Sequence, residues 1–150
     1  MELCDKSILE LRSLLDDKEI SSIELTKYYL NRIGQIDKQI ESYITVCEEE
    51  ALKAAELADA RIARGEAATL TGIPISIKDN MCTKGVHTTC ASRMLENFVP
   101  PYNATVVNKL LAEHAVILGK VSMDEFAMGG STQTSYFKKT KNPYDSSRVP

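Results

Sequence analysis

Two apolar segments flank a helical pattern in this sequence, and few folds accommodate that order. In the first segment, Thr71–Met81, isoleucines alternate with other residues, which is the period of a β-strand with one apolar face. The second, Ala115–Val121, is almost entirely apolar, as in a buried parallel strand. Between them, Thr105–Ala115 places valine and leucine pairs on one helical face. Strand, loop, helix and strand form a right-handed crossover, so we predict an α/β fold with a mixed, mostly parallel sheet.

The part of the chain before this unit is predicted to be mainly helical. Ser21 and Glu24 have the spacing of a capping box in front of a helix. The predicted helices span residues 7–18, 21–33 and 47–65, with a short strand at 42–46. We therefore expect one domain over residues 1–150, with helices in 1–65 and the sheet-forming part in 70–150.

Lys78 ends the first predicted strand, and two interpretations of it remain open. If the face of the sheet that carries Lys78 is in contact with water, a charged side chain needs no further role there. If both faces are covered, the loss of solvent favours the neutral amine, which is able to act as a general base. Open α/β sheets bind their ligands at the carboxyl ends of parallel strands, which favours a functional role for Lys78.

Composition and charge exclude several classes of function. The 150 residues carry a net charge of −3, which gives no electrostatic case for direct binding of nucleic acid or a membrane surface. No segment approaches the ~18 apolar residues of a membrane span, and the amino terminus lacks the apolar core of a secretion signal. The four cysteines form no CxxC pair, so we expect reduced thiols, no metal site and a cytoplasmic location. A small basic cluster at Lys138, Lys139 and Lys141 is able to meet a partner or a phosphate, although most clusters of this kind are solvated surface.

Two long polar segments are candidates for a binding site. Residues 81–104 have little periodicity, and loops of that length in compact domains tend to be functional. Residues 123–150 are dense in glycine, serine, threonine, asparagine and proline. In this second segment Gly129, Gly130 and Ser131 are able to offer backbone amides and a hydroxyl to a polar ligand, and a surface turn is the alternative.

Several motifs in residues 72–150 have the order and spacing of a known family. They are GIPISIKDN, TTCAS, LENFVPPY, ATVV, ILGK, MDEFAMG and NPYD. On these motifs the chain resembles the amidase signature family over more than half of its length. CASRMLENFVPPY together with MDEFAMGGST is most similar to the tRNA-dependent amidotransferase branch of that family. The resemblance implies the amidase signature fold, of which residues 1–150 would be a truncated, N-terminal part.

The resemblance also implies roles for individual residues. The lysine of the IKDN motif is Lys78, and in the family this lysine is the base of a serine, cis-serine, lysine triad. The loop that lines the family's substrate pocket corresponds to Met128, Gly129, Gly130 and Ser131. Both triad serines would follow Pro150. We therefore expect the chain alone to be inactive, and poorly soluble or partly unfolded.

The activity that the resemblance implies is the release of ammonia from glutamine. A B subunit would use that ammonia, with ATP and Mg²⁺, to convert Glu-tRNA(Gln) to Gln-tRNA(Gln), and a C subunit would join the other two. This chain itself would hold no cofactor and no metal. It departs from the family at Gln133, where the family usually has glutamate. A stand-alone amidase of the same family and a non-catalytic interaction module remain as alternative functions.

Overall fold

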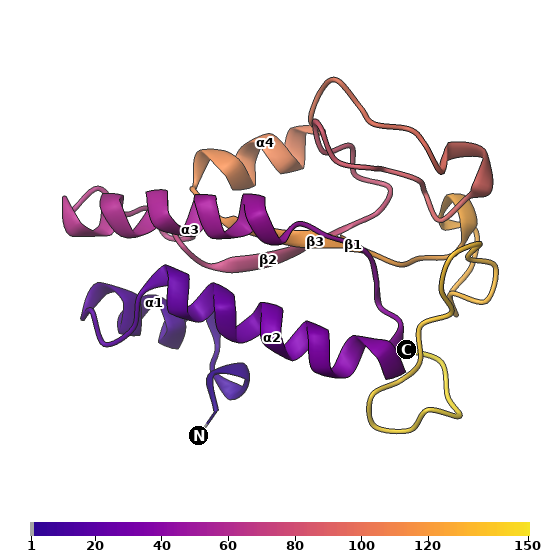
Figure 1. Ribbon diagram of the computed structural model, residues 1–150, viewed down its shortest axis with the longest axis horizontal. Coiled ribbons are helices and arrows are strands. Elements are labelled where there is room, and N and C mark those ends of the chain that lie inside the picture. The colour runs from indigo at the N-terminus through magenta and orange to yellow at the C-terminus, as the bar shows by residue number, and fades with distance from the viewer. Residues whose placement is uncertain (1) are drawn as a thin grey trace. The chain divides into compact units, whose positions relative to one another are not determined.

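Within residues 2–150, the part of the chain that this computed structural model describes, four α-helices and three β-strands form (Figure 1). The helices are α1 (Ile8–Asp16), α2 (Ser22–Ile40), α3 (Glu48–Ala63) and α4 (Thr105–Ala112). The strands are β1 (Tyr43–Val46), β2 (Pro74–Lys78) and β3 (Val116–Val121). Three short 3₁₀ helices are added at Leu3–Asp5, Arg93–Leu95 and Glu125–Ala127. The mixture of helices and strands confirms the predicted α/β class.

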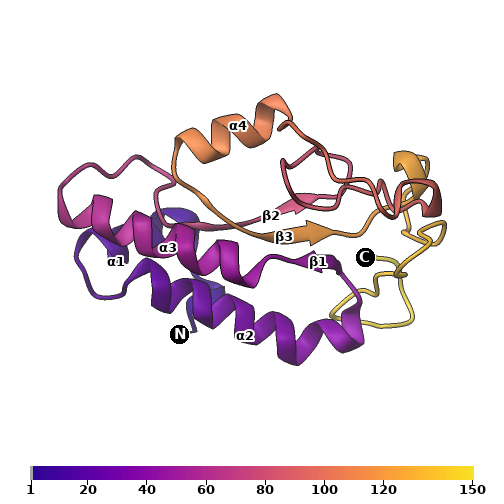
Figure 2. The same ribbon diagram turned by 45° about the horizontal axis from the view of Figure 1, so that its top comes forward.

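The strands form one mixed sheet in which β3 lies between β1 and β2 (Figure 2). Val116 donates its N–H to the carbonyl of Ile73 at 2.9 Å, and Asp79 donates to Val121 at 3.1 Å. The residues that these two bonds join advance in the same direction, so β2 and β3 are parallel. The pairing of β1 with β3 is antiparallel. The helix α4 connects β2 to β3, which confirms the predicted strand, loop, helix and strand unit.

The chain divides into two compact units. The first comprises Met1–Ile33, Cys47–Ile75 and Lys109–Leu118, and the second comprises Gly34–Val46, Ser76–Asn108 and Gly119–Pro150. Both parts of the predicted site, Lys78 and the loop Met128–Ser131, belong to the second unit. The expectation of a single domain over residues 1–150 stays a prediction.

In the first unit, α2 begins at the capping box that the sequence predicts. Ser21 donates its N–H to the Glu24 carboxylate at 2.8 Å, and Glu24 donates its N–H to the Ser21 hydroxyl at 3.1 Å. Asp59 of α3 accepts the N–H groups of Ser22 at 2.6 Å and Ile23 at 3.1 Å. The first N–H groups of α2 therefore have acceptors from its own turn and from α3.

The core of the first unit is apolar. Its buried cluster consists of Leu11, Leu15, Leu25 and Ile73, and the partly buried residues packed against it are Leu3, Ile20, Tyr29, Ile62 and Ile75. Fully burying one such leucine or isoleucine contributes about 1.5–3 kcal/mol. Leu11 and Leu15 of α1 and Leu25 of α2 are thus buried together with Ile73, the residue directly before β2.

Candidate functional site

Lys78 is the last residue of β2, at the carboxyl end of its parallel pairing with β3. Its side chain is exposed, and within residues 2–150 it makes no hydrogen bond and no ion pair. The Lys78 carbonyl accepts the N–H of Met81 at 3.0 Å, which closes a turn directly after the strand. The residues that the structure describes therefore leave the amine open to solvent, where parallel sheets bind ligands.

A buried ion pair lies directly after the end of β2. In this pair Nζ of Lys120, on β3, is 3.3 Å from Oδ1 of Asp79, and neither side chain has exposed surface. The ammonium donates to the carbonyl of Met81 at 3.0 Å and to the hydroxyl of Thr88 at 2.8 Å. Oδ1 receives no aligned hydrogen bond, whereas Oδ2 accepts the N–H of Thr89 at 3.0 Å and the Thr89 hydroxyl. The pair therefore fastens the end of β2 to β3 and to the loop that follows.

Cys90 connects the end of β2 with the 3₁₀ turn that carries Phe126. It donates its N–H to the carbonyl of Asp79 at 3.1 Å, and its own carbonyl accepts the N–H of Phe126 at 2.9 Å. Cys90 and Ala91 have φ values of 51° and 54°, in the left-handed region that side chains rarely adopt. Non-glycine residues keep this backbone conformation only where the surrounding structure stabilises it, and such residues are frequent at functional sites.

The Cys90 thiol is not a candidate nucleophile. Partial burial and then the negative charge of Asp79 raise the pKa of the Cys90 thiol above its ordinary value. The thiol therefore stays protonated at neutral pH, and the thiolate is the form that attacks carbonyl carbons.

Asp124 holds the predicted substrate loop. Its carboxylate accepts the N–H of Ser131 at 2.8 Å and the N–H of Thr132 at 2.9 Å. It also accepts two hydrogen bonds from Thr134, from the N–H at 3.2 Å and from the hydroxyl at 2.8 Å. These hydrogen bonds favour the charged carboxylate and lower the pKa of Asp124 to about 2, with the largest contribution from the N–H of Ser131. The loop Met128–Ser131 is exposed at its first three residues. The Ser131 N–H already has an acceptor inside the protein.

The structure links the two parts of the predicted site through the backbone. Hydrogen bonds run from the residue after Lys78 to Cys90, and from Cys90 to Phe126, which directly precedes the Ala127–Met128 stretch. Among residues 2–150, no hydrogen bond joins the Lys78 amine to the loop. That Lys78 and the loop belong to one site, and the roles of both, stay predictions.

Sequence analysis missed Asp79, Lys120 and Asp124. For Lys120 a signal was present, because a lysine inside an otherwise apolar buried strand requires a buried partner. The nearest acidic candidate was Asp79, directly after Lys78. Because successive strand residues point to opposite faces, Asp79 would point to the face that does not carry Lys78. Asp124 carried no comparable signal. The groups that donate to its carboxylate belong to residues 131–134, and they reach it only because that loop folds back onto Asp124.

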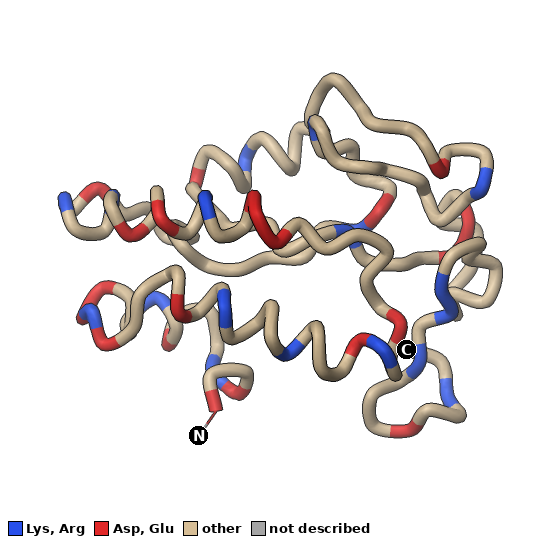
Figure 3. Tube along the Cα trace, in the orientation of Figure 1, with Lys and Arg blue, Asp and Glu red and all other residues tan. Residues whose placement is uncertain are grey.

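Two of the three lysines in the basic cluster near the carboxyl terminus, Lys138 and Lys141, form ion pairs with acidic residues. Nζ of Lys138 is 3.3 Å from Asp37, and Nζ of Lys141 is 3.6 Å from Glu41. Figure 3 shows acidic and basic residues together on each of the helices α1, α2 and α3. The two ion pairs, with both lysine side chains partly exposed, agree with the interpretation of this cluster as solvated surface.

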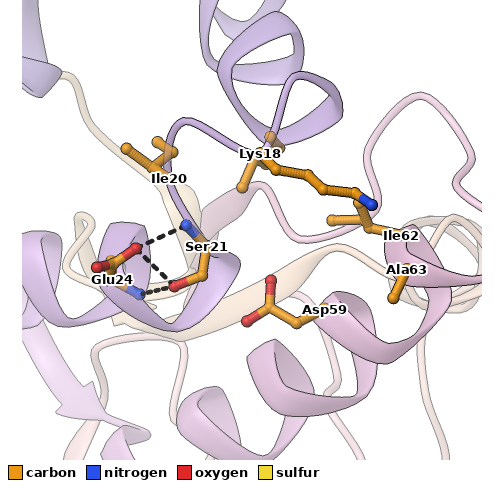
Figure 4. A pocket seen from close by; sticks show the side chains of 8 residues that line it. Lys18, Ile20, Ser21, Glu24, Asp59, Ile62 and Ala63 are labelled. Atoms are coloured by element: carbon orange, nitrogen blue, oxygen red, sulfur yellow. Dashed lines mark hydrogen bonds between the residues drawn. The ribbon is translucent and has the colours of Figure 1, made fainter.

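A hollow of about 320 Å³ in the first unit lies beside the start of α2 (Figure 4). Its walls are formed by Leu15, Lys18, Ile20, Ser21, Glu24, Asp59, Ile62 and Ala63. Ser21 and Glu24 bond to each other, and Asp59 accepts backbone N–H groups of α2. These polar groups therefore serve the start of the helix.

Residues 2–150 form neither a membrane-spanning helix nor a cluster of metal ligands. None of the helices described there combines the length and the apolar character of a membrane-spanning segment. In the same residues, no three His, Cys, Asp or Glu side chains come together where they could share a metal ion.

Known proteins resemble this chain in sequence and in fold. The model of the amidase family matches residues 24–150. The whole chain is 59% identical to the A subunit of glutamyl-tRNA(Gln) amidotransferase from Ruminiclostridium cellulolyticum, and it spans 31% of that protein's length. The crystal structure of the corresponding A subunit from Thermotoga maritima superposes with a TM-score of 0.81 at 35% identity, over 100% of this chain and 30% of that one. The peptide amidase of Stenotrophomonas maltophilia superposes with a TM-score of 0.87 at 29% identity, over 95% of this chain and 31% of that one.

The family model covers most of the chain, including β2 with Lys78 and the loop held by Asp124. The fold agrees with solved amidases from two different functional groups. The predicted resemblance is therefore confirmed, and the chain belongs to the amidase family.

Proposed function

We propose that the protein containing this chain is the amidase subunit of a tRNA-dependent amidotransferase, and that it releases ammonia from glutamine. The observation that carries the proposal is the 59% identity over all 150 residues to a protein of that name, compared with 29% to a peptide amidase. An identity of that size over the strands and loops of the candidate site supports a shared substrate as well as a shared fold.

Lys78 is the general base in this proposal. Its amine has no acidic partner within residues 2–150, and the adjacent carboxylate of Asp79 is already compensated by Lys120. A nearby uncompensated carboxylate would favour the charged ammonium, which cannot accept a proton. The proposal further requires that the Lys78 amine, which is exposed within the described residues, loses its solvent in the assembled enzyme, because loss of solvent favours the neutral form that accepts a proton.

In this proposal the reaction proceeds through two serines of the whole protein that lie outside residues 1–150. The bridging serine gives its proton to Lys78 and takes one from the nucleophilic serine. The nucleophile attacks the side-chain amide carbon of glutamine. The proton taken up by Lys78 then passes back through the bridging serine to the leaving nitrogen, so that ammonia leaves as an acyl-enzyme forms. Water then hydrolyses the acyl-enzyme to glutamate. The loop Met128–Ser131, fixed by Asp124, forms part of the glutamine pocket.

The ammonia is used by a partner subunit. A B subunit, which holds ATP and Mg²⁺, activates misacylated Glu-tRNA(Gln) and receives the ammonia, and a C subunit joins the two larger subunits. In this proposal the present chain binds no cofactor, contacts the tRNA only through the B subunit, and works in the cytoplasm.

The test is a substrate comparison with the complete protein, purified with its B and C subunits. We expect ammonia release from glutamine, and conversion of Glu-tRNA(Gln) to Gln-tRNA(Gln) when ATP and Mg²⁺ are present. The 150-residue chain assayed alone should release no ammonia. Hydrolysis of peptide amides without hydrolysis of glutamine would instead identify a stand-alone amidase, as the similarity to the peptide amidase fold permits.

A further inference from the structure

We propose that the buried pair Asp79 and Lys120 positions Lys78 for proton transfer. Neither side chain is exposed, so both act as positioning residues that do not touch the substrate. This inference rests on the proposed role of Lys78 as the base. It assigns a task to two buried charged residues that the reaction itself does not use.

The first support is the way Lys120 holds the turn that begins at Lys78. The carbonyl of Lys78 accepts the N–H of Met81 at 3.0 Å, and the carbonyl of Met81 accepts a hydrogen bond from Nζ of Lys120, also at 3.0 Å. The ammonium of Lys120 is therefore two hydrogen bonds away from the backbone of Lys78. Without Nζ, the Met81 carbonyl would lose this hydrogen bond, and the turn would no longer be held in its present geometry.

The second support is that the alternation of side chains continues from the end of β2 into the next residue, Asp79. Asp79 is buried and Lys78 is exposed, so the two point to opposite faces of the sheet. The backbone of Asp79 is bonded on both sides, since its N–H donates to Val121 at 3.1 Å and its carbonyl accepts from Cys90 at 3.1 Å. With the carboxylate also fixed by Thr89, Asp79 has little freedom to rotate. The direction of the Lys78 side chain is set by its fixed neighbour.

The third support is the chemistry of a buried pair. Burying two charges removes both from water, and replacing such a pair by apolar residues of similar volume is often neutral for stability or stabilising. Stability alone therefore gives no reason for charges at these two positions. Directed hydrogen bonds from Nζ to Met81 and Thr88 are what an apolar side chain cannot supply.

The experiment separates positioning from stability in the complete enzyme with its B and C subunits. The variants are Lys120→Met, Asp79→Asn, and the double variant, in which no buried charge remains unpaired. Lys109→Met, at an exposed lysine of α4, is the matched control. For each protein the melting temperature is recorded, and kcat and KM for glutamine hydrolysis are measured at a temperature where that protein is folded.

We expect both single variants to have a lower melting temperature, because each leaves one buried charge without its partner. The double variant should recover most of the melting temperature but not kcat, which should stay about 10²-fold below wild type with KM changed less than about threefold. Lys109→Met should match wild type in all three quantities.

Two results would overturn the inference. One is a folded Lys120→Met enzyme with wild-type kcat, and the other is a double variant in which kcat returns together with the melting temperature. Should Lys120→Met fail to fold, the double variant decides the question. Lys78→Ala, assayed in parallel, keeps the two proposals apart, because wild-type glutaminase activity in that variant would refute the proposed function itself.

Discussion

A Cβ atom on Gly129 would lie 2.5 Å from Cγ of Asp124, closer than real Cβ contacts come. The absence of a side chain at Gly129 lets the predicted substrate loop pass directly against the carboxylate that holds it. The next residue, Gly130, has open space at the same position, with nothing within 4 Å of its Cβ site. The two glycines therefore have different structural requirements although they are adjacent.

Gly129→Ala should loosen the loop, whereas Gly130→Ala should not. The added methyl group forces the Asp124 carboxylate or the loop backbone to move, and overpacking of this kind costs about 1–3 kcal/mol in the free energy of unfolding. Gly130→Ala should stay within about 0.5 kcal/mol of wild type. Denaturant unfolding of the complete protein measures both, and equal effects of the two substitutions would contradict this packing.

Stability in acid should report the hydrogen bonds to Asp124. Its pKa is lowered from 3.8 to about 2, first by the N–H of Ser131 and then by that of Thr132. A carboxyl group with a lowered pKa stabilises the fold above its unfolded pKa, and this contribution is lost as the pH falls through the folded value. The contribution of Asp124 should therefore disappear between about pH 4 and pH 2. Denaturant unfolding of wild type and Asp124→Asn over that range should give converging stabilities, and a constant difference between them would argue against the shift.

Gly72 and Gly65 offer a test of packing in the first unit. Both have left-handed backbones, with φ values of 78° and 72°. A Cβ on Gly72 would lie 2.8 Å from Oγ of Ser22, whereas a Cβ on Gly65 would meet nothing within 4 Å. Gly65→Ala should cost about 1–2 kcal/mol for its backbone conformation alone. Gly72→Ala should cost about 1–3 kcal/mol more. Denaturant unfolding gives both values. If the Gly72→Ala protein were as stable as the Gly65→Ala protein, the Ser22 side chain would be able to move away from the new methyl group without cost, which would contradict the predicted clash.

Much of the backbone was predictable from the sequence because local signals agreed with the tertiary fold. The alternation of isoleucines predicted β2, the paired valines and leucines predicted α4, and the capping box predicted the start of α2. The end of α2 was not predictable. The helix runs to Ile40 rather than Ile33, and it stops at Glu41, whose φ of 61° is a conformation usually supplied by glycine.

The candidate site was predictable in position but not in its supporting contacts. The period of β2 places Lys78 at the end of a strand, yet its exposure depends on which segments cover that face of the sheet. The partner of Lys120 is Asp79, 41 positions away and directly after the end of β2, and the pairing of β2 with β3 brings the two together. The acceptor role of Asp124 likewise depends on a loop that returns to it through space.

Ammonia release from glutamine by the complete protein carrying Lys78→Ala decides whether Lys78 is the base. Removal of a general base lowers rates about 10²–10⁴-fold, so we expect kcat to fall by at least about 10²-fold in a protein that melts as a folded enzyme. Lys109→Ala, which removes an exposed lysine from α4, should keep the wild-type rate. A folded Lys78→Ala enzyme that hydrolyses glutamine at the wild-type rate would contradict the proposed role of Lys78.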